Sequence, residues 1–252
     1  MLCATLLSAW QMLAQTADRP AAPVQAPAST QCQDDAKQVV EMKAQLADWA
    51  QLDRYRAADA TLPPPTSGEQ RVVFYGDSIT DFWGHPTGVF FPGKPYVNRG
   101  ISGQTTPQML VRFQQDVVHL SPAVVVLQGG TNDIAGNTGP STPEMIEDNF
   151  TSMADIAKQS GIKMVIASIL PASGYFWSPA VHPVEETRTI NAWLKNFCEK
   201  NGLVYLDYYD ALADAQGAMR PGLSSDGVHP TAAGYEVMAP LAEKAITEAL
   251  QK

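Results

Sequence analysis

The sequence is poor in the residues that metal sites and nucleic-acid-binding surfaces require. It has only three cysteines and four histidines in 252 residues, with no Cys-x-x-Cys pair and no His/Cys cluster, which argues against a structural zinc site. Its 17 Lys and Arg residues are outnumbered by 26 Asp and Glu residues, which gives a net charge of −9. This charge argues against a nucleic-acid partner held by phosphate contacts, and no basic run suggests a membrane-surface patch.

Long apolar runs are also missing. Residues 1–16 are apolar-rich and uncharged but too short to span a bilayer as a helix, so no stable membrane insertion is expected. They resemble the apolar region of a secretory signal peptide, with Ala14-Gln15-Thr16 as the candidate cleavage site, although no Lys or Arg precedes them. We therefore expect a secreted or periplasmic protein. The alternative is a disordered start on a cytoplasmic protein.

The small number of cysteines leaves two readings of their role. Removal of a signal peptide would take Cys3 with it, and Cys32 and Cys198 could then form a disulfide in an oxidising compartment. The alternative is that Cys198, which lies in an apolar helical pattern, is a small buried hydrophobic residue.

The chain before residue 70 differs from the rest. Residues 17–33 are rich in Pro and Ala and predict a flexible linker. Residues 34–69 predict a helix as far as about residue 60 and then an extended segment that starts at the prolines 63–65. Apolar residues recur along this helix at three- and four-residue steps, at Val39, Met42, Leu46 and Trp49. We expect it to pack on the outside of the main domain, residues 70–252.

Within the main domain, short apolar runs alternate with longer amphipathic stretches. The predicted strands are residues 72–75, 96–98, 123–127, 164–168 and 203–206. The predicted helices are residues 106–119, 143–160, 184–201 and 232–250. This alternation predicts an α/β fold of the flavodoxin-like class. We expect a three-layer α/β/α sandwich around a central, mostly parallel five-stranded sheet, with ligands bound beyond the carboxyl ends of the strands.

Ser78 follows the first predicted strand directly, in the segment Gly76-Asp77-Ser78-Ile79-Thr80. A serine on a strand-to-helix turn is exposed where backbone N–H groups and the positive helix end converge, which favours a developing oxyanion. The alternative is that Ser78 is a helix cap or a turn residue, which is a common role for serine.

Near the other end of the chain, Asp226-Gly227-Val228-His229-Pro230 places a carboxylate three residues before an imidazole. On a tight turn Asp226 can reach one ring nitrogen of His229, fix its tautomer, and leave the second nitrogen free to take a proton from a serine. The remaining histidines have no comparable neighbour; they are His85, His119 and His182.

Two further turns follow predicted strands and offer hydrogen-bond donors. Asn132, in Gly129-Gly130-Thr131-Asn132-Asp133, can donate a side-chain N–H to an oxyanion. Gly103 has no side chain to block the approach of its backbone N–H. Taken singly, each turn favours ordinary turn chemistry, because Gly and Asn are common in turns.

Together the four segments resemble the SGNH hydrolases, also called the GDSL esterase/lipase family, over about residues 70–250. The order Gly-Asp-Ser, glycine, Gly-x-Asn-Asp and Asp-x-x-His is that family's, with Ile79 where the family name implies leucine. The resemblance implies a Ser78 nucleophile, a His229 base and an orienting Asp226, without metal or organic cofactor. The implied oxyanion hole consists of the Ser78 and Gly103 N–H groups and the Asn132 side chain.

Aromatic residues near these segments suggest a substrate surface. Trp83 lies about one helical turn beyond Ser78, and Phe176 and Trp177 lie in a loop after a predicted strand. Their aromatic faces could stack on sugars, although Trp83 and Phe176 could equally be core residues. Asp77 and Val228, beside the triad residues, complete the candidate set.

No long apolar lid is visible, which favours short acyl groups. The leading hypothesis is therefore an esterase acting on small-molecule or carbohydrate esters, in particular acetyl esters. The resemblance also fits a lysophospholipase, an acetylhydrolase of platelet-activating-factor type or a thioesterase. An inactive hydrolase-like carbohydrate-binding module is the alternative outside the enzymes, because fold does not fix function.

Overall fold

A computed structural model of the chain describes residues 30–252, with side chains from residue 33 onward. The chain divides into two units after Ala44, and residues 45–252 form the larger, compact one. The expected signal peptide, most of the expected linker and the Cys3 and Cys32 side chains lie outside the described residues. Among the helices that are described, none is both long enough and apolar enough to cross a membrane.

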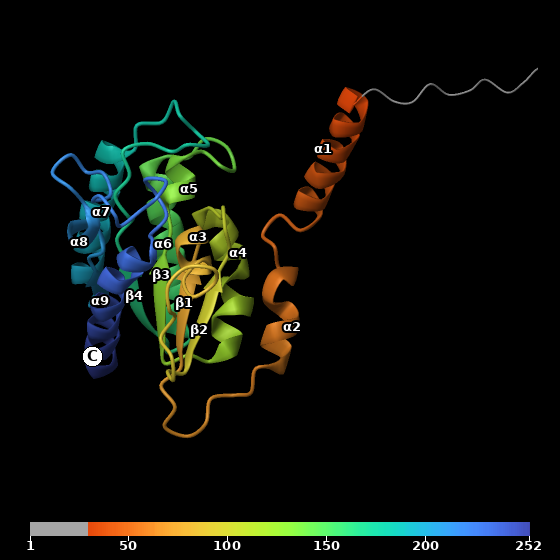
Figure 1. Ribbon diagram of the computed structural model, residues 1–252. Coiled ribbons are helices and arrows are strands. Elements are labelled where there is room, and N and C mark those ends of the chain that lie inside the picture. Colours follow the sequence, from red (N-terminus) through yellow and green to blue (C-terminus); the bar gives the residue numbers. More distant parts are fainter. Residues whose placement is uncertain (1–29) are drawn as a thin grey trace, which may run out of the picture. The chain divides into compact units, whose positions relative to one another are not determined.

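A sheet of five strands forms the centre of the second unit, in the order β2-β1-β3-β4-β5 (Figure 1). The strands are β1 (Val72–Gly76), β2 (Tyr96–Gly100), β3 (Val124–Gln128), β4 (Lys163–Ala167) and β5 (Val204–Leu206). Every pairing is parallel, and Gly76 at the end of β1 is in register with both Gly100 and Gln128. The strand that follows β1 in the chain, β2, lies on one side of it, and the remaining strands lie on the other side. The boundary between β1 and β3 is therefore a topological switch point.

Helices cover both faces of this sheet, which confirms the predicted α/β/α sandwich. Side chains alternate along each strand, so Val73 and Tyr75 enter one core while Val72 and Phe74 enter the other. The first core is closed by α4 (Thr106–Asp116), α6 (Pro143–Gln159) and α7 (Val184–Asn201). The second is closed by α3 (Ser78–Asp81), α8 (Tyr209–Leu212) and α9 (Ala232–Gln251).

Most predicted elements of the main domain agree with the structure to within a few residues. The helix expected over residues 184–201 is α7, and it contains Cys198 as a buried free thiol rather than a disulfide partner. The helix expected over residues 106–119 is interrupted: α4 ends at Asp116, and a short 3₁₀ turn follows at Val118–Leu120. A further short helix, α5 (Thr131–Ile134), begins directly after β3 and carries Asn132.

The expectation of a single N-terminal helix is wrong. The chain forms α1 (Thr30–Ala47), which begins inside the expected linker, and then α2 (Asp53–Thr61). The Asp48 carboxylate accepts the Leu52 N–H at 2.8 Å and the Asp53 N–H at 3.0 Å, which starts a new helix there. Gln51 has φ 54°, a left-handed conformation through which no right-handed helix continues. Leu46 and Trp49, the part of the expected apolar stripe that lies in the second unit, are exposed.

Residues 49–52, between the two helices, dock on the main domain through glutamine side chains. Gln108 donates to the Trp49 carbonyl at 2.6 Å, and Gln115 donates to the Leu52 carbonyl at 2.7 Å. Gln104, just before α4, donates to the Ala50 carbonyl at 2.8 Å. The helix break frees these carbonyls, and the three amides satisfy them.

One residue of α2 forms an ion pair with the end of β2. Asp59 accepts from two nitrogens of Arg99, Nε at 2.8 Å and Nη2 at 2.5 Å, and both side chains are about nine-tenths buried. Burial raises the pKa of Asp59 and Arg99 lowers it, and burial has the larger effect. The ion pair therefore contributes little net stability compared with the two charges separated in water. Removing one partner is different, because it leaves the other charge buried alone.

We therefore predict that Asp59→Ala lowers the free energy of unfolding by about 3 kcal/mol, measured by urea denaturation. Asp53→Ala is the matched control, because Asp53 pairs with Arg56 on the same helix but both side chains are exposed. Its loss should stay below about 1 kcal/mol. Equal losses in the two variants would contradict a special role for burial at Arg99.

Candidate active site

Ser78 is the first residue of α3, immediately beyond the carboxyl end of β1. Asp77 precedes it as the helix cap, with its Oδ1 accepting the Ile79 N–H at 2.9 Å. The short helix rests on the end of β2 at Gly100, where a Cβ atom would lie only 2.1 Å from the Asp81 nitrogen. Glycine is therefore required there for the serine turn to approach the sheet, and Ser78 is left 8% exposed.

Ser78, His229 and Asp226 form a continuous hydrogen-bonded chain. Ser78 Oγ lies 2.9 Å from His229 Nε2, and His229 Nδ1 lies 2.7 Å from Asp226 Oδ2. The contact between Ser78 and His229 joins residues 151 positions apart in the sequence, whereas Asp226 is only three residues from His229. This is the arrangement in which an imidazole can take the proton of a serine hydroxyl.

Asp226 is held as a carboxylate by the turn in which it lies. Its Oδ1 accepts the N–H groups of Val228 at 2.9 Å and His229 at 2.8 Å, and the Ser224 hydroxyl at 3.1 Å. Partial burial raises its pKa, but the hydrogen bonds from the His229 side chain and these backbone groups outweigh that effect. The pKa of Asp226 is lowered to about 2. A negative charge therefore faces the His229 ring across the neutral pH range.

The candidate oxyanion donors follow the three neighbouring strands at the same edge of the sheet. Gly103 lies in the turn after β2 and adopts φ 78°, a conformation that favours glycine. Asn132 lies in α5 after β3, and its Nδ2 donates to the Gln104 carbonyl at 3.0 Å. A primary amide has two N–H groups, so one remains for a ligand.

Asn137, which the sequence reading did not single out, orients this amide. Its Nδ2 donates to Asn132 Oδ1 at 2.8 Å and to the Gly103 carbonyl at 3.1 Å. Its own Oδ1 accepts the indole N–H of Trp177 at 2.9 Å. The available signal was a second asparagine in the turn Gly136-Asn137-Thr138-Gly139, five residues after Asn132.

The residues suggested as substrate contacts divide into two groups. The first group is buried beneath the site and consists of Asp77, Trp83 and Val228. Trp83 is 3% exposed and stacks on Tyr235 with ring centroids 4.9 Å apart, which agrees with the alternative prediction that it is a core residue. Phe176 is 67% exposed, so the alternative prediction that it is a core residue is wrong.

Two aromatic rings lie close to His229. Trp177 packs edge-on against Phe176, and its ring centroid lies 6.3 Å from that of His229. Phe82, which the sequence reading missed, lies on the turn after α3 with its centroid 5.1 Å from His229. The imidazole is therefore flanked by aromatic surface on the α3 side and on the loop after β4.

Two buried carboxyl groups lie under the site. Burial raises the pKa of Asp77 to about 7, and Asp77 Oδ2 has no hydrogen-bond partner. Burial also raises the pKa of Asp133 to about 6, although Asp133 accepts the Thr106 hydroxyl at 2.6 Å and its backbone N–H at 2.9 Å. Across the described residues, no group of three or more His, Cys, Asp or Glu side chains is placed to hold a metal ion.

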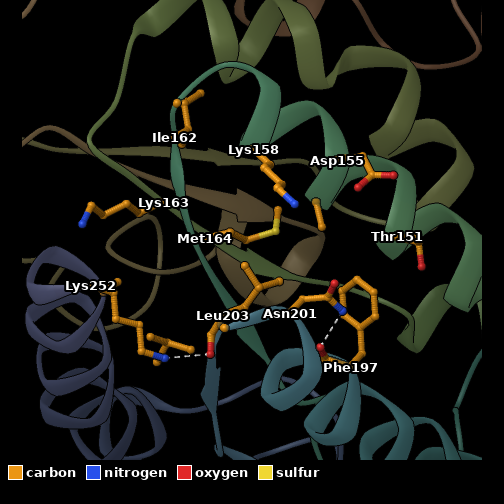
Figure 2. A pocket seen from close by; sticks show the side chains of 15 residues that line it. Thr151, Asp155, Lys158, Ile162, Lys163, Met164, Phe197, Asn201, Leu203 and Lys252 are labelled. Carbon is orange, nitrogen blue, oxygen red and sulfur yellow. Dashed lines mark hydrogen bonds between the residues drawn. The ribbon is translucent and has the colours of Figure 1, made fainter.

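A large pocket lies elsewhere, at the amino-terminal ends of the strands and so at the opposite end of the sheet from Ser78 (Figure 2). Its volume is about 340 Å³, and its walls include Lys163 and Val204, which begin β4 and β5. Since Ser78 follows the carboxyl end of a parallel strand, this pocket cannot contain the triad.

The chain is similar to several known proteins. The sequence matches the model of the GDSL-like Lipase/Acylhydrolase family over residues 74–237. A solved candidate acylhydrolase from Bacteroides fragilis is 42% identical with a TM-score of 0.77, covering 80% of this chain and 98% of that one. A solved GDSL-like lipase from Bacteroides thetaiotaomicron is 39% identical with a TM-score of 0.76, covering 79% and 98%.

Three curated sequences are more distant. The esterase TesA of Pseudomonas aeruginosa is 30% identical over 142 residues, which is 54% of this chain and 62% of TesA. An acetylxylan esterase of Geobacillus stearothermophilus is 26% identical over 205 residues, 69% of this chain and 91% of the esterase. The uncharacterised Bacillus subtilis lipoprotein YqeF is 31% identical over 78 residues, or 30% of this chain. The chain thus spans 32% of YqeF and 62% of TesA.

The buried Asp77 carboxyl predicts a pH dependence of stability. Because its pKa is raised from 3.8 to about 7, the folded chain keeps a proton that the unfolded chain releases above pH 4. The stability that this proton provides is complete below pH 4 and is lost as the pH rises through 7. Asp77→Asn retains an acceptor for the Ile79 N–H but cannot ionise.

We expect the free energy of unfolding of the wild type, relative to Asp77→Asn, to fall by on the order of 3 kcal/mol between pH 4 and pH 7. Urea denaturation of both proteins at a series of pH values measures this difference. Parallel stability curves for the two proteins would show that Asp77 does not titrate in this range.

Proposed function

The chain belongs to the GDSL-like lipase/acylhydrolase family, a family of carboxylic ester hydrolases, and from this we propose that it is a serine esterase that works through an acyl-enzyme on Ser78. The observation that carries the proposal is the hydrogen-bonded chain from Ser78 Oγ through His229 to Asp226, with distances of 2.9 Å and 2.7 Å. The alternative, in which Ser78 is only a helix cap, does not require an imidazole to be hydrogen-bonded to the serine hydroxyl.

The proposed reaction has two halves. In the first, Ser78 Oγ attacks the ester carbonyl carbon while His229 Nε2 takes the hydroxyl proton, and Asp226 stabilises the imidazolium. Collapse of the tetrahedral intermediate breaks the C–O bond, and His229 gives its proton to the leaving alcohol. In the second half, His229 removes a proton from water as the water oxygen attacks the acyl carbon. Collapse of this second intermediate breaks the bond to Ser78 Oγ, which takes the proton back from His229 as the acid leaves.

The negative charge of each tetrahedral intermediate needs donors that are already in place. We assign this role to the backbone N–H groups of Ser78 and Gly103 and to the free N–H of the Asn132 amide. The supporting geometry is the fixed orientation of that amide, because Gln104 accepts one of its N–H groups and Asn137 donates to its oxygen. Donors held in this way do not have to reorganise during the reaction.

For the substrate, we propose short-chain esters, in particular acetyl groups on carbohydrate. The exposed Phe176 ring beside Trp177 provides an aromatic surface next to His229, and such surfaces stack on sugar rings. The similarity to an acetylxylan esterase supports the same choice. We further propose that the protein is secreted or periplasmic, on the signal-like start and the similarity to a lipoprotein.

Ser78→Ala should lower kcat for p-nitrophenyl acetate by at least about 10⁴-fold, because the nucleophile is removed while the fold is kept. Ser152→Ala, on α6, is the control and should leave kcat unchanged.

Assays with p-nitrophenyl esters from acetate to palmitate then define the range of acyl chains that the protein hydrolyses. Serine-dependent hydrolysis of palmitate in preference to acetate would favour a lysophospholipase or thioesterase. The absence of any hydrolysis and of phosphonate labelling at Ser78 would favour an inactive binding module.

Phe176→Ala should raise KM for an acetylated xylo-oligosaccharide by about fivefold, because a stacking contact of roughly 1 kcal/mol is lost. KM for p-nitrophenyl acetate should change less than twofold, since that substrate has no sugar to stack. Val111→Ala removes an exposed apolar side chain from α4 and serves as the control. An equal rise in KM for both substrates would argue against a sugar platform at Phe176.

A further inference from the structure

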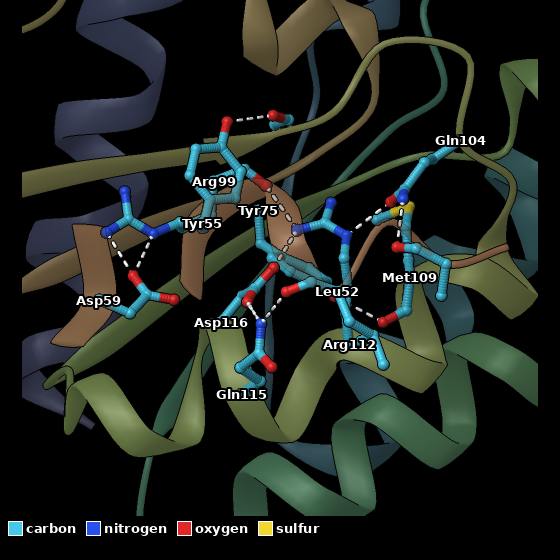
Figure 3. A network of polar contacts seen from close by, with 12 residues as sticks. Leu52, Tyr55, Asp59, Tyr75, Arg99, Gln104, Met109, Arg112, Gln115 and Asp116 are labelled. Atoms are coloured by element: carbon cyan, nitrogen blue, oxygen red, sulfur yellow. Dashed lines mark hydrogen bonds and ion pairs between the residues drawn. The ribbon is translucent and has the colours of Figure 1, made fainter. Parts of the chain in front are cut away.

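Arg112 lies at the centre of a buried polar network that includes Gln104 and Asp116 (Figure 3). It lies on α4, and its side chain has no exposed area. Its Nη2 donates to the Gly76 carbonyl at 2.9 Å and its Nη1 to the Arg99 carbonyl at 2.9 Å. Its Nε donates to the Gln104 side chain at 2.5 Å. One guanidinium therefore connects the last residues of β1 and β2 to the loop that follows β2.

The contact with Gly76 acts on the serine turn. Gly76 is two residues before Ser78, and its carbonyl accepts two hydrogen bonds, one from Arg112 and one from the Ile101 N–H at 3.0 Å. The end of β1 is thus tied directly to the loop that contains Gly103. A displacement of this carbonyl would move the Ser78 N–H relative to that loop.

The other two contacts bracket Gly103. Arg99 and Gln104 lie on either side of the turn that contains it, and Arg112 binds the carbonyl of the first and the side chain of the second. The Gln104 backbone carbonyl in turn accepts the Asn132 Nδ2 at 3.0 Å. Each of the three proposed oxyanion donors is therefore linked to Arg112 by at most two hydrogen bonds and a short stretch of chain.

The network is not explained by charge neutralisation alone. Asp116, also fully buried, accepts from Arg112 at 3.0 Å, and the guanidinium lies 4.1 Å from the Tyr75 ring centroid. A buried ion pair can often be replaced by apolar side chains of similar volume without loss of stability. An apolar side chain cannot bind two carbonyls and an amide oxygen at fixed positions. The planar guanidinium can, because its five donors have a rigid geometry.

We propose that Arg112 is a positioning residue, which holds the loops of Ser78, Gly103 and Asn132 at the spacing that a tetrahedral oxyanion requires. The proposal rests on the esterase function proposed above. Arg112 does not touch the substrate and acts only through backbone groups and Gln104. Functional donors must be held to within about 0.5 Å of the productive geometry, and a displacement of about 1 Å can cost about 100-fold in rate.

The test is Arg112→Lys, which keeps a positive charge beside Asp116 but replaces the planar fork by a single ammonium. We expect kcat for p-nitrophenyl acetate to fall by about 10- to 100-fold with KM changed less than threefold. The acidic limb of the pH–rate profile should keep its midpoint, because the Ser78–His229–Asp226 contacts are unaltered. A trifluoromethyl ketone, whose adduct with Ser78 places an oxyanion in the same hole, should bind more weakly by the same factor as the loss in kcat/KM.

Arg71→Lys is the matched control. Arg71 is also buried, and it donates to two backbone carbonyls, those of Leu120 at 3.0 Å and Pro63 at 2.7 Å, and pairs with Glu69. It precedes β1 and so lies at the opposite edge of the sheet from Ser78. We expect the two variants to lose similar thermal stability, with kcat reduced only in Arg112→Lys.

Gln104→Met is a second variant, chosen because it removes one contact of Arg112 and retains the charge pair. It should lower kcat in the same sense by a smaller factor. If both Arg→Lys variants lose kcat equally, or if Arg112→Lys and Gln104→Met keep the wild-type kcat, the positioning role is wrong.

Amide hydrogen exchange separates this result from a failure of the esterase assignment. Residues 100–104 should exchange faster in Arg112→Lys than in the wild type or in Arg71→Lys, whether or not any ester is hydrolysed. A wild type that is inactive on every ester overturns the proposed function. Unchanged exchange at residues 100–104 overturns the positioning role of Arg112.

Discussion

Parallel pairing of β1 with both β2 and β3 is the constraint on which the candidate site depends. Because the three strands run the same way and end in register at Gly76, Gly100 and Gln128, the turns that follow them emerge together at one edge. Ser78, Gly103 and Asn132 lie in those turns. The pairing is stabilised by burial of both sheet faces, so the hydrophobic cores and the site geometry have the same origin.

Helix α4 connects this edge of the sheet to the N-terminal segment. Its buried Arg112 binds the strand ends, while Gln108 and Gln115 bind the carbonyls of residues 49–52. Gln104 contacts both systems, because its side chain meets Arg112 and the Ala50 carbonyl. Residues 49–61 lie before the stretch that matches the family, yet they are packed as part of the same unit as the triad.

Local sequence patterns were sufficient for much of the site. Ser78 and Asn132 each follow an apolar run that is buried on both faces, β1 and β3, and such runs are hard to place anywhere except in a central strand. Gly103 follows the edge strand β2, which is only partly buried. The contact between Asp226 and His229 spans only three residues, so one turn determines it. The contact between His229 and Ser78 spans 151 residues, and it was inferred from the order of four motifs rather than from any local signal.

The sequence by itself determined the strand and helix order, the parallel sheet and the residues at its carboxyl edge, because buried strands and amphipathic helices have distinct apolar periods. Only the tertiary structure decided the burial of Trp83 and the exposure of Phe176. It also decided the contacts of Asn137 and those of Arg112, a charged residue that would ordinarily be exposed but is fully buried. The reason is that each depends on partners distant in the chain, and burial follows from packing rather than from residue type.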